Sequence, residues 1–379
     1  MKRWVMFLLA AVFFTVLGQE VVWAQGELPV EDSLVDSMDL DSVQEAVDGL
    51  LGESSISFDE ALQELMTGEQ PFSGENMAQM VLTFLEASWG TQKTIWIHIL
   101  ILVLAAALCS NFSSLFSNGQ LGEMSFYLVY LLVFTLLVKN LGILSEELQD
   151  TLKGVVAFMQ ALTPAYFLAV ATATGASTAA MFYQVVLLVI TLVERILINL
   201  VLPGIHVFVL LSFVNQLYKE DLLSRMADLL KNMICWTMKT MMGVIVGLQV
   251  TRSLISPALD SLRRTAIGKT AGAIPGLGNA INAVTEMVLG SAVLVRNCVG
   301  VTAVIILFLC ALQPVLHISV SGFTYRFLAA FTQPVSDKRM VGALQAMGEG
   351  CSLLLKVLFT TEILFLLTIA ILAGTVSGV

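Results

Sequence analysis

Residues 124–144 read MSFYLVYLLVFTLLVKNLGIL and hold one charged side chain, Lys139. A helix needs about 20 mostly apolar residues to cross the roughly 30 Å hydrocarbon core of a bilayer. The last apolar run, residues 353–374 (LLLKVLFTTEILFLLTIAILAG), has the same character. These runs predict an all-α protein, a helical bundle that crosses the membrane several times.

The composition of the whole chain agrees with a membrane protein. Of the 379 residues, 57% are apolar and 13% are charged, whereas soluble domains carry about 25% charged residues. The net charge of −10 is unevenly spread: residues 25–94 hold fifteen acids and one base, and residues 95–379 hold thirteen acids and sixteen bases. We therefore exclude a soluble enzyme, and the lack of a basic patch excludes nucleic-acid binding.

The chain begins like an exported protein. Lys2 and Arg3 precede the apolar run of residues 4–17, and Ala24 ends a plausible cleavage site. This pattern predicts a signal sequence over residues 1–24, either cleaved or kept as an anchor. In both cases residues 25–93 lie outside the cytoplasm.

The acidic segment, residues 25–93, is predicted to be partly helical. Ser42 with Glu45 and Ser57 with Glu60 each fit a capping box, in which the hydroxyl accepts from a free helical N–H. Such short acidic helices either bury their apolar stripes against each other or a partner, or stay disordered until they bind.

The membrane domain covers residues 94–379, for which we predict six to eight spans. The candidates are 95–110, 124–144, 155–173, 179–198, 199–217, 233–251, 298–316 and 353–374. The fourth and fifth are separated only near Pro203, so they form either one broken helix or a tight re-entrant pair.

Orientation follows from the bases, which favour the cytoplasmic side. Residues 218–232 and 317–352 are expected inside, and the acidic residues 145–153 outside. Residues 252–297 disagree, since their five bases fall on the predicted outer side. Either this segment is an amphipathic or re-entrant glycine-rich element, or the number of spans differs by one.

Charged residues inside apolar runs are candidates for function, because charge in a membrane is costly. Glu362 lies near the centre of the last run, and we expect it to pair with a base on another helix or to face a lumen. The alternative is a slightly shifted span, which would place Glu362 away from the membrane centre. Glu194 and Arg195 are adjacent in an apolar stretch. They either line a pore or contact another helix, or simply lie at the membrane interface.

Glycines spaced by four residues let two helices approach closely. Gly243 and Gly247 have this spacing inside an apolar span, and Gly268, Gly272 and Gly276 repeat it before the last two spans. They predict packing surfaces for another copy of the chain or another subunit. For the second set, a flexible loop with glycine turns is an equal alternative.

No set of residues predicts chemistry. The three histidines His98, His206 and His317 are far apart, and no metal-binding spacing occurs. We therefore expect no catalytic residues, no metal and no cofactor.

Two stretches carry a family resemblance: AIPGLGNA at residues 273–280 and GSAVLVRNCVG at residues 290–300. With the signal sequence, the acidic exported segment and the polytopic body, they resemble stage III sporulation protein AE of endospore-forming Gram-positive bacteria. The resemblance covers most of the chain from about residue 90 onward.

The resemblance implies a multipass component of the transenvelope complex that links mother cell and forespore. That complex is similar to secretion machinery, and it is thought to act as a channel that is needed for sporulation after engulfment. The expected location is the mother-cell membrane around the forespore. The expected partners are the lipid bilayer, other membrane and ring-forming proteins of the complex, and further copies of this chain.

Two other classes remain open from the residues alone. A stand-alone secondary transporter would use Glu362 or Glu194 in a midplane site and would work alone in liposomes. A passive membrane scaffold would need only its packing faces and the acidic segment.

Overall fold

The structure of the chain is a computed structural model. It describes residue 35, residues 38–51 and 57–67, single residues and short segments between 82 and 108, and residues 119–174, 176–217, 222–271, 278–334 and 336–373. All regular structure in this part is helical, which confirms the predicted all-α class.

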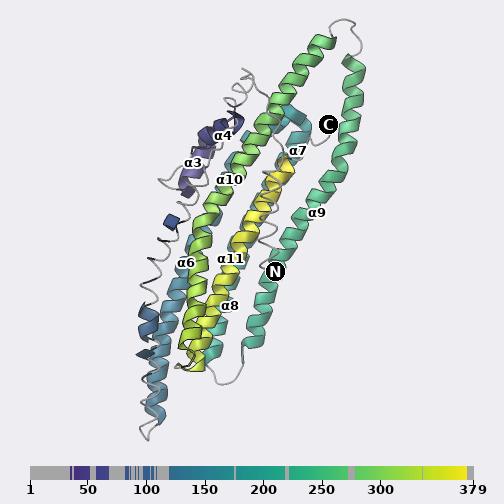
Figure 1. Cartoon of the computed structure of the whole chain (residues 1–379). Helices are drawn as coiled ribbons and strands as arrows, with labels where there is room; N and C mark the ends of the chain where they lie inside the picture. The colour runs from purple at the N-terminus through teal and green to yellow at the C-terminus, as the bar shows by residue number, and fades with distance from the viewer. Residues whose placement is uncertain are drawn as a thin grey trace.

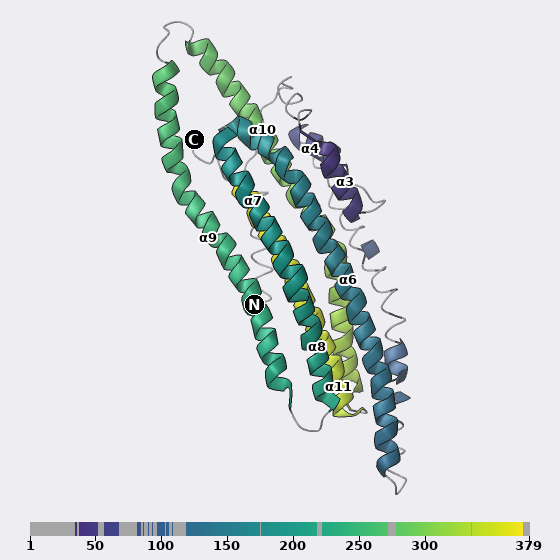
Figure 2. The same cartoon turned by 180° about the vertical axis from the view of Figure 1, so that it is seen from behind.

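Long helical rods lie side by side and form an elongated bundle (Figures 1 and 2). In chain order the helices are α3 (Leu40–Leu51), α4 (Phe58–Thr67), α6 (Gly119–Thr174), α7 (Ala176–Ile196), η2 (Leu197–Val201), α8 (Leu202–Leu217), α9 (Ser224–Ala271), α10 (Gly278–Thr332) and α11 (Lys338–Ala373). Consecutive rods run in opposite directions (Figure 1). One end of the bundle therefore holds Leu217, Ser224, Thr332 and Lys338, and we call it the turn end.

α6 is one unbroken helix where the sequence suggested two spans. It contains both candidates, 124–144 and 155–173, and continues through the acidic stretch 145–153. Its 56 residues correspond to a length of about 84 Å, far more than one membrane crossing requires.

An apolar stripe explains why α6 does not turn at residues 145–153. Leu141, Leu144, Leu148 and Leu152 are all buried and recur every three or four residues. Glu146 and Asp150 point away from this stripe and are exposed. The acidic stretch is thus the outer face of a helix whose inner face stays apolar.

The fourth and fifth candidate spans form one rod interrupted by a single wide turn. The π-helical η2 separates α7 from α8, and the N–H of Leu202 donates to the carbonyl of Leu197. Pro203 follows directly; it lacks an N–H, and its ring would clash with the preceding turn of a regular α-helix. The wider turn accommodates the proline without ending the rod, as in the broken-helix alternative.

Four helices of the described part are long and apolar enough to cross a membrane. They are Phe126–Leu168, Tyr183–Leu217, Gly290–Thr332 and Lys338–Ile369. The candidate 233–251 lies within α9, and the candidate 95–110 falls where only scattered residues are described. The higher number of spans therefore stays a prediction.

The predicted glycine-rich element, residues 252–297, is divided between two helices. Residues 252–271 form the last part of α9, and residues 278–297 form the first part of α10. Its role at the membrane stays a prediction.

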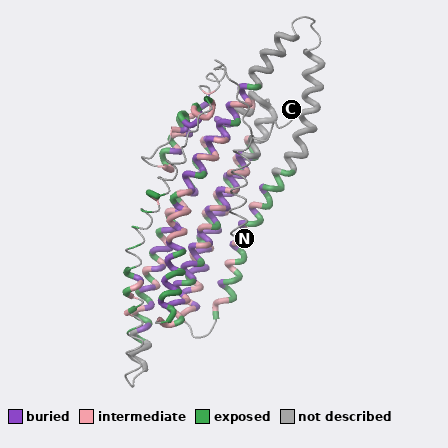
Figure 3. The backbone as a smooth tube through the Cα atoms, in the orientation of Figure 1, coloured by how far each residue is buried: buried purple, intermediate pink, exposed green. Residues whose placement is uncertain are grey.

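α11 is the central helix of the bundle. It packs against α10, α8, α6 and α9, and most of its side chains are buried (Figure 3). Phe365, Leu358 and Leu354 are fully buried along it. A polar side chain on the buried side of α11 is therefore surrounded by protein.

The acidic segment contributes two short helices that pack on the outside of the bundle. α3 rests on α6, and α4 contacts α10. The ring of Phe58 lies 6.5 Å from that of Phe158, centroid to centroid. Val43, Val47 and Leu62 are fully buried in the same contact, so α3 and α4 use their apolar stripes to cover the bundle.

Side chains cap and join these two helices. The hydroxyl of Ser57 accepts from the N–H of Glu60 at 3.2 Å, as the capping pattern predicted. At α3 the role of Ser42 is different: the helix begins at Leu40, and Asp39 accepts from the Ser42 hydroxyl at 2.9 Å. The Gln44 side chain accepts from the N–H of Phe58 at 2.7 Å, which ties α3 to the start of α4.

Candidate functional site

Glu362 lies inside the bundle, on the central helix. Its side chain is 5% exposed, and its carboxyl group lies near enough to the Cys310 thiol of α10 for the two to interact electrostatically. The carboxylate thus faces protein and not lipid. The alternative that it opens onto a lumen receives no support from this burial.

The expected base is not found beside Glu362. No Lys, Arg or His of the described part forms an ion pair with it, and its Oε1 atom has no hydrogen-bond partner there. The hydroxyl groups of Thr360 and Thr361 donate instead to the carbonyls of Lys356 and Val357, at 2.6 and 3.0 Å. Glu362 is thus a buried carboxyl group whose Oε1 receives no hydrogen bond from the described residues.

Glu194 and Arg195 lie at the end of α7, just before η2. Glu194 is half-buried, and Arg195 is exposed on the outside of the bundle. Neither forms an ion pair with a described residue, and the structure does not bring them together with Glu362. This position resembles the interfacial alternative more than a pore lining.

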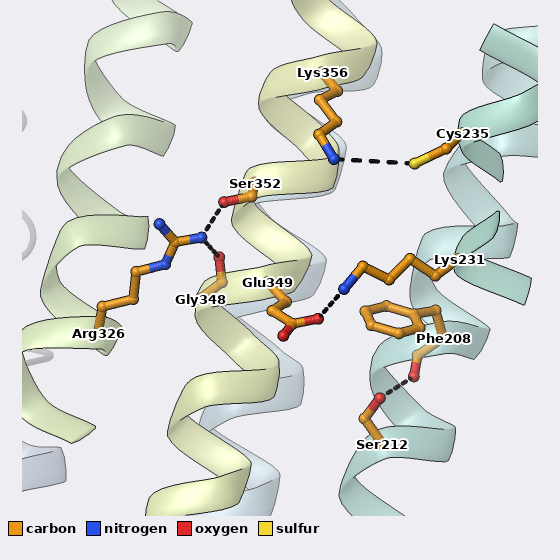
Figure 4. A network of polar contacts seen from close by, with 9 residues as sticks. All are labelled: Phe208, Ser212, Lys231, Cys235, Arg326, Gly348, Glu349, Ser352 and Lys356. Carbon is orange, nitrogen blue, oxygen red and sulfur yellow. Dashed lines mark hydrogen bonds and ion pairs between the residues drawn. The ribbon is translucent and has the colours of Figure 1, made fainter. Parts of the chain in front are cut away.

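A line of polar contacts joins α11 to its neighbours nearer the turn end (Figure 4). On one side, Lys231 of α9 reaches Glu349 at 2.6 Å and lies 5.8 Å from the ring centroid of Phe208. On the other side, Arg326 of α10 donates to the Ser352 hydroxyl and the Gly348 carbonyl.

Further along α11, the ammonium of Lys356 lies 3.9 Å from the sulfur of Cys235 on α9 (Figure 4). Together, these contacts hold both α9 and α10 to the central helix.

Two more polar pairs join α6 to α10. His317 Nδ1 and Glu147 Oε2 are 2.6 Å apart, and the Asn140 amide donates to the Tyr325 hydroxyl. Sequence reasoning did not find these pairs, because their members lie 170 and 185 residues apart. The polar residues of a single apolar run do not reveal which helix they meet.

The predicted glycine pair on α9 faces outward. A Cβ atom added at Gly243 or Gly247 would meet no described atom within 4 Å, so none of the described helices packs closely there. Gly268 lies on the part of α9 whose side chains are not described, and Gly272 and Gly276 lie outside the described residues. Their role in packing stays a prediction.

Close approach occurs at glycines that the sequence analysis did not single out. A Cβ at Gly350 would lie 2.6 Å from Val209 Cγ2, and one at Gly348 would lie 2.9 Å from Arg326 Cγ. A Cβ at Gly342 would lie 2.5 Å from the Gln216 side chain. In the sequence, the cluster of glycines at residues 342–350 was the pattern that could have indicated this close packing.

The described residues hold no group of three or more His, Cys, Asp or Glu side chains placed to bind a metal ion. The polar groups form isolated pairs between helices. The arrangement supports helix association and contains one buried acid, Glu362.

Comparison with known proteins connects this architecture to one family. The family model for stage III sporulation protein AE matches residues 56–376, which include α4 and every long helix. Stage III sporulation protein AE of Bacillus subtilis (strain 168) is 22% identical over 332 residues, covering 87% of this chain and 82% of that protein. No solved structure matches the chain. Because the match extends over most of the chain, this protein belongs to the stage III sporulation protein AE family.

Proposed function

We propose that the chain is a multipass component of the channel complex that links mother cell and forespore and is required after engulfment. The observation that carries this proposal is the family match over residues 56–376, which covers the whole helical bundle. The bundle suits such a part, because its polar groups join helices to one another and its outer surface is apolar over long stretches.

The proposed location is the mother-cell membrane around the forespore, with residues 25–93 outside the cytoplasm. Asp41, Glu45 and Asp48 are exposed on the outer side of α3, where lipid contact would be very unfavourable. The part of α6 that α3 covers, near Gly154, therefore lies beyond the hydrocarbon core.

The turn end is proposed to be cytoplasmic. Arg225, Lys338 and Arg339 lie there, and bases near span ends favour the cytoplasmic side. Between the turn end and α3, exposed apolar side chains cover the bundle. They are Leu128, Leu131 and Leu132 on α6 and Phe323, Phe327 and Phe331 on α10. This region is the proposed membrane band.

The outward face of α9 is the proposed contact with another copy of the chain or another subunit. Gly243 leaves open space where a side chain would be, and Met233 and Trp236 are exposed on the same helix. Small residues in a membrane helix allow a second backbone to approach. This arrangement supports the expected partners and homo-oligomer.

Co-purification from sporulating cells tests the proposal. A tagged chain is expected to retain other membrane and ring-forming proteins of the complex. Gly243→Leu should reduce this retention while the protein level in the membrane stays normal, because a Cβ at this position meets no described atom within 4 Å. Val244→Leu, an exposed apolar neighbour, is the matched control. A wild-type chain that purifies alone would contradict membership of a complex.

The alternative of a stand-alone secondary transporter draws on Glu362, the one acid that is buried among the described residues. Transport by the purified chain alone in liposomes would favour it. If Glu362→Gln lowers the spore yield only in proportion to the amount of complex that is lost, a passive scaffold is favoured.

A further inference from the structure

The starting observation is the neutral environment of Glu362. The side chain is 5% exposed and comes from the central helix. Its Oε1 atom has no hydrogen-bond partner in the described part of the chain. An ionised carboxylate in such surroundings is strongly disfavoured unless a cation or several donors compensate it.

The neighbouring helices supply no such compensation among the described residues. On α10 the facing ionisable group is the Cys310 thiol, which carries no positive charge. His317, two turns further along α10, is held by Glu147 of α6 at 2.6 Å. Arg296 lies fourteen residues before Cys310, about 21 Å along the helix.

Three further bases of the described part also point elsewhere. Lys356, on α11 itself, is directed at Cys235 of α9. Lys239 of α9 and Arg195 of α7 are exposed on the outside of the bundle. Lys153 of α6 lies 3.8 Å from Asp150, and among the described residues neither Glu194 nor His206 donates to Glu362 Oε1. Among the described residues nothing compensates a charge on Glu362, which favours the uncharged carboxylic acid.

We propose that Glu362 is a proton-binding site whose occupancy controls the packing of α11 against α10. With the proton bound, the two helices close around a neutral carboxyl group in the packing that the structure describes. When the proton leaves, the charge requires water or a cation, and the contact around Cys310 must open. The proposal concerns the isolated chain and does not depend on its membership of a channel complex.

The protonation state can be measured by infrared spectroscopy of the purified full chain in lipid nanodiscs. Isotope-labelled glutamate identifies the carboxylic-acid band. At neutral pH one protonated glutamate band is expected, and it should be absent from Glu362→Gln. Glu349→Gln is the matched control, because Glu349 lies on the same helix but is paired with Lys231 at its surface. This variant should keep the band.

The coupling to packing can be measured by hydrogen exchange of α10 and α11 as the pH is raised, with intrinsic exchange rates corrected for. If opening releases one proton, protection of α10 and α11 should fall about tenfold for each pH unit over the pH range in which opening releases that proton. Glu362→Gln should show no such dependence, whereas Glu349→Gln should keep the pH dependence of the wild type even where loss of its pair with Lys231 lowers the overall protection.

Three results would overturn the proposal. The first is the absence of a protonated glutamate band at neutral pH in the labelled wild type, a measurement that does not require the variant to fold. The second is a protonated glutamate band that disappears as the pH rises while the protection of α10 and α11 from hydrogen exchange stays constant. The third is an opening that follows sodium concentration at fixed pH, which would identify a metal cation as the ligand.

Discussion

Asp337 organises the connection between α10 and α11 at the turn end. Its Oδ1 accepts from the backbone N–H of Arg339 at 2.9 Å, and its Oδ2 accepts from the guanidinium at 3.2 Å. The guanidinium carbon in turn lies 3.9 Å from the ring centroid of Phe126. Partial burial tends to raise the pKa of Asp337, but the hydrogen bonds and charge of Arg339 outweigh it, and this pKa lies below its usual value.

This lowered pKa gives a pH prediction with a defined sign. The stabilisation by ionised Asp337 is present above the unfolded pKa of about 3.9 and is lost as the pH falls through the lower folded value. Asp337→Asn should melt at a lower temperature than the wild type at pH 7, and the difference should vanish in acid. Thermal unfolding in detergent measures it. A difference that is independent of pH would show that the charge is unimportant.

Sequence reasoning at the residue scale found the unusual acid but not its surroundings. The position of Glu362 in an apolar run predicted contact with protein, because the cost of charge in lipid is large. The expected base is missing among the described residues. Which side chain faces Glu362 depends on how α10 and α11 are placed along each other, and a single sequence does not specify that register.

At the scale of helices, hydropathy predicted the type of secondary structure better than it predicted the length of each helix. The acids of residues 145–153 indicated a loop, yet Leu144, Leu148 and Leu152 keep one side of α6 buried through this stretch. The continuing stripe was visible in the sequence and predicts an unbroken helix. Net charge along a segment ignores the side of the helix on which each charge lies.

Glycines that lie against a neighbouring helix and glycines that face open space should respond differently to an added side chain. In Gly350→Ala the new Cβ would lie 2.6 Å from Val209 Cγ2, and such overpacking costs about 1–3 kcal/mol. In Gly243→Ala the new Cβ meets open space, and the better helix propensity of alanine adds up to about 1 kcal/mol.

Thermal unfolding of the purified chain in detergent measures both variants. Gly350→Ala should melt at a lower temperature than the wild type, whereas Gly243→Ala should melt at the same or a higher temperature. Equal losses in both variants would contradict the described packing of α11 on α8.

At the scale of the whole molecule, the proposed orientation can be tested with impermeant thiol reagents in a cysteine-free background. Gly49→Cys on α3 should react in intact cells, and Ser224→Cys at the turn end should react only after the cells are opened. Gly49 suits the label because an added Cβ meets nothing within 4 Å. Labelling of Ser224→Cys alone in intact cells would reverse the orientation.

The place of the molecule in its cell rests on the family match, since hydropathy and packing describe only a membrane bundle with an acidic outer segment. The direct test is deletion of the gene in its own host. Vegetative growth should be normal and engulfment should finish, but forespore gene expression after engulfment should fail and heat-resistant spores should be lost. A heat-resistant spore count equal to that of the parent strain would contradict the proposed role.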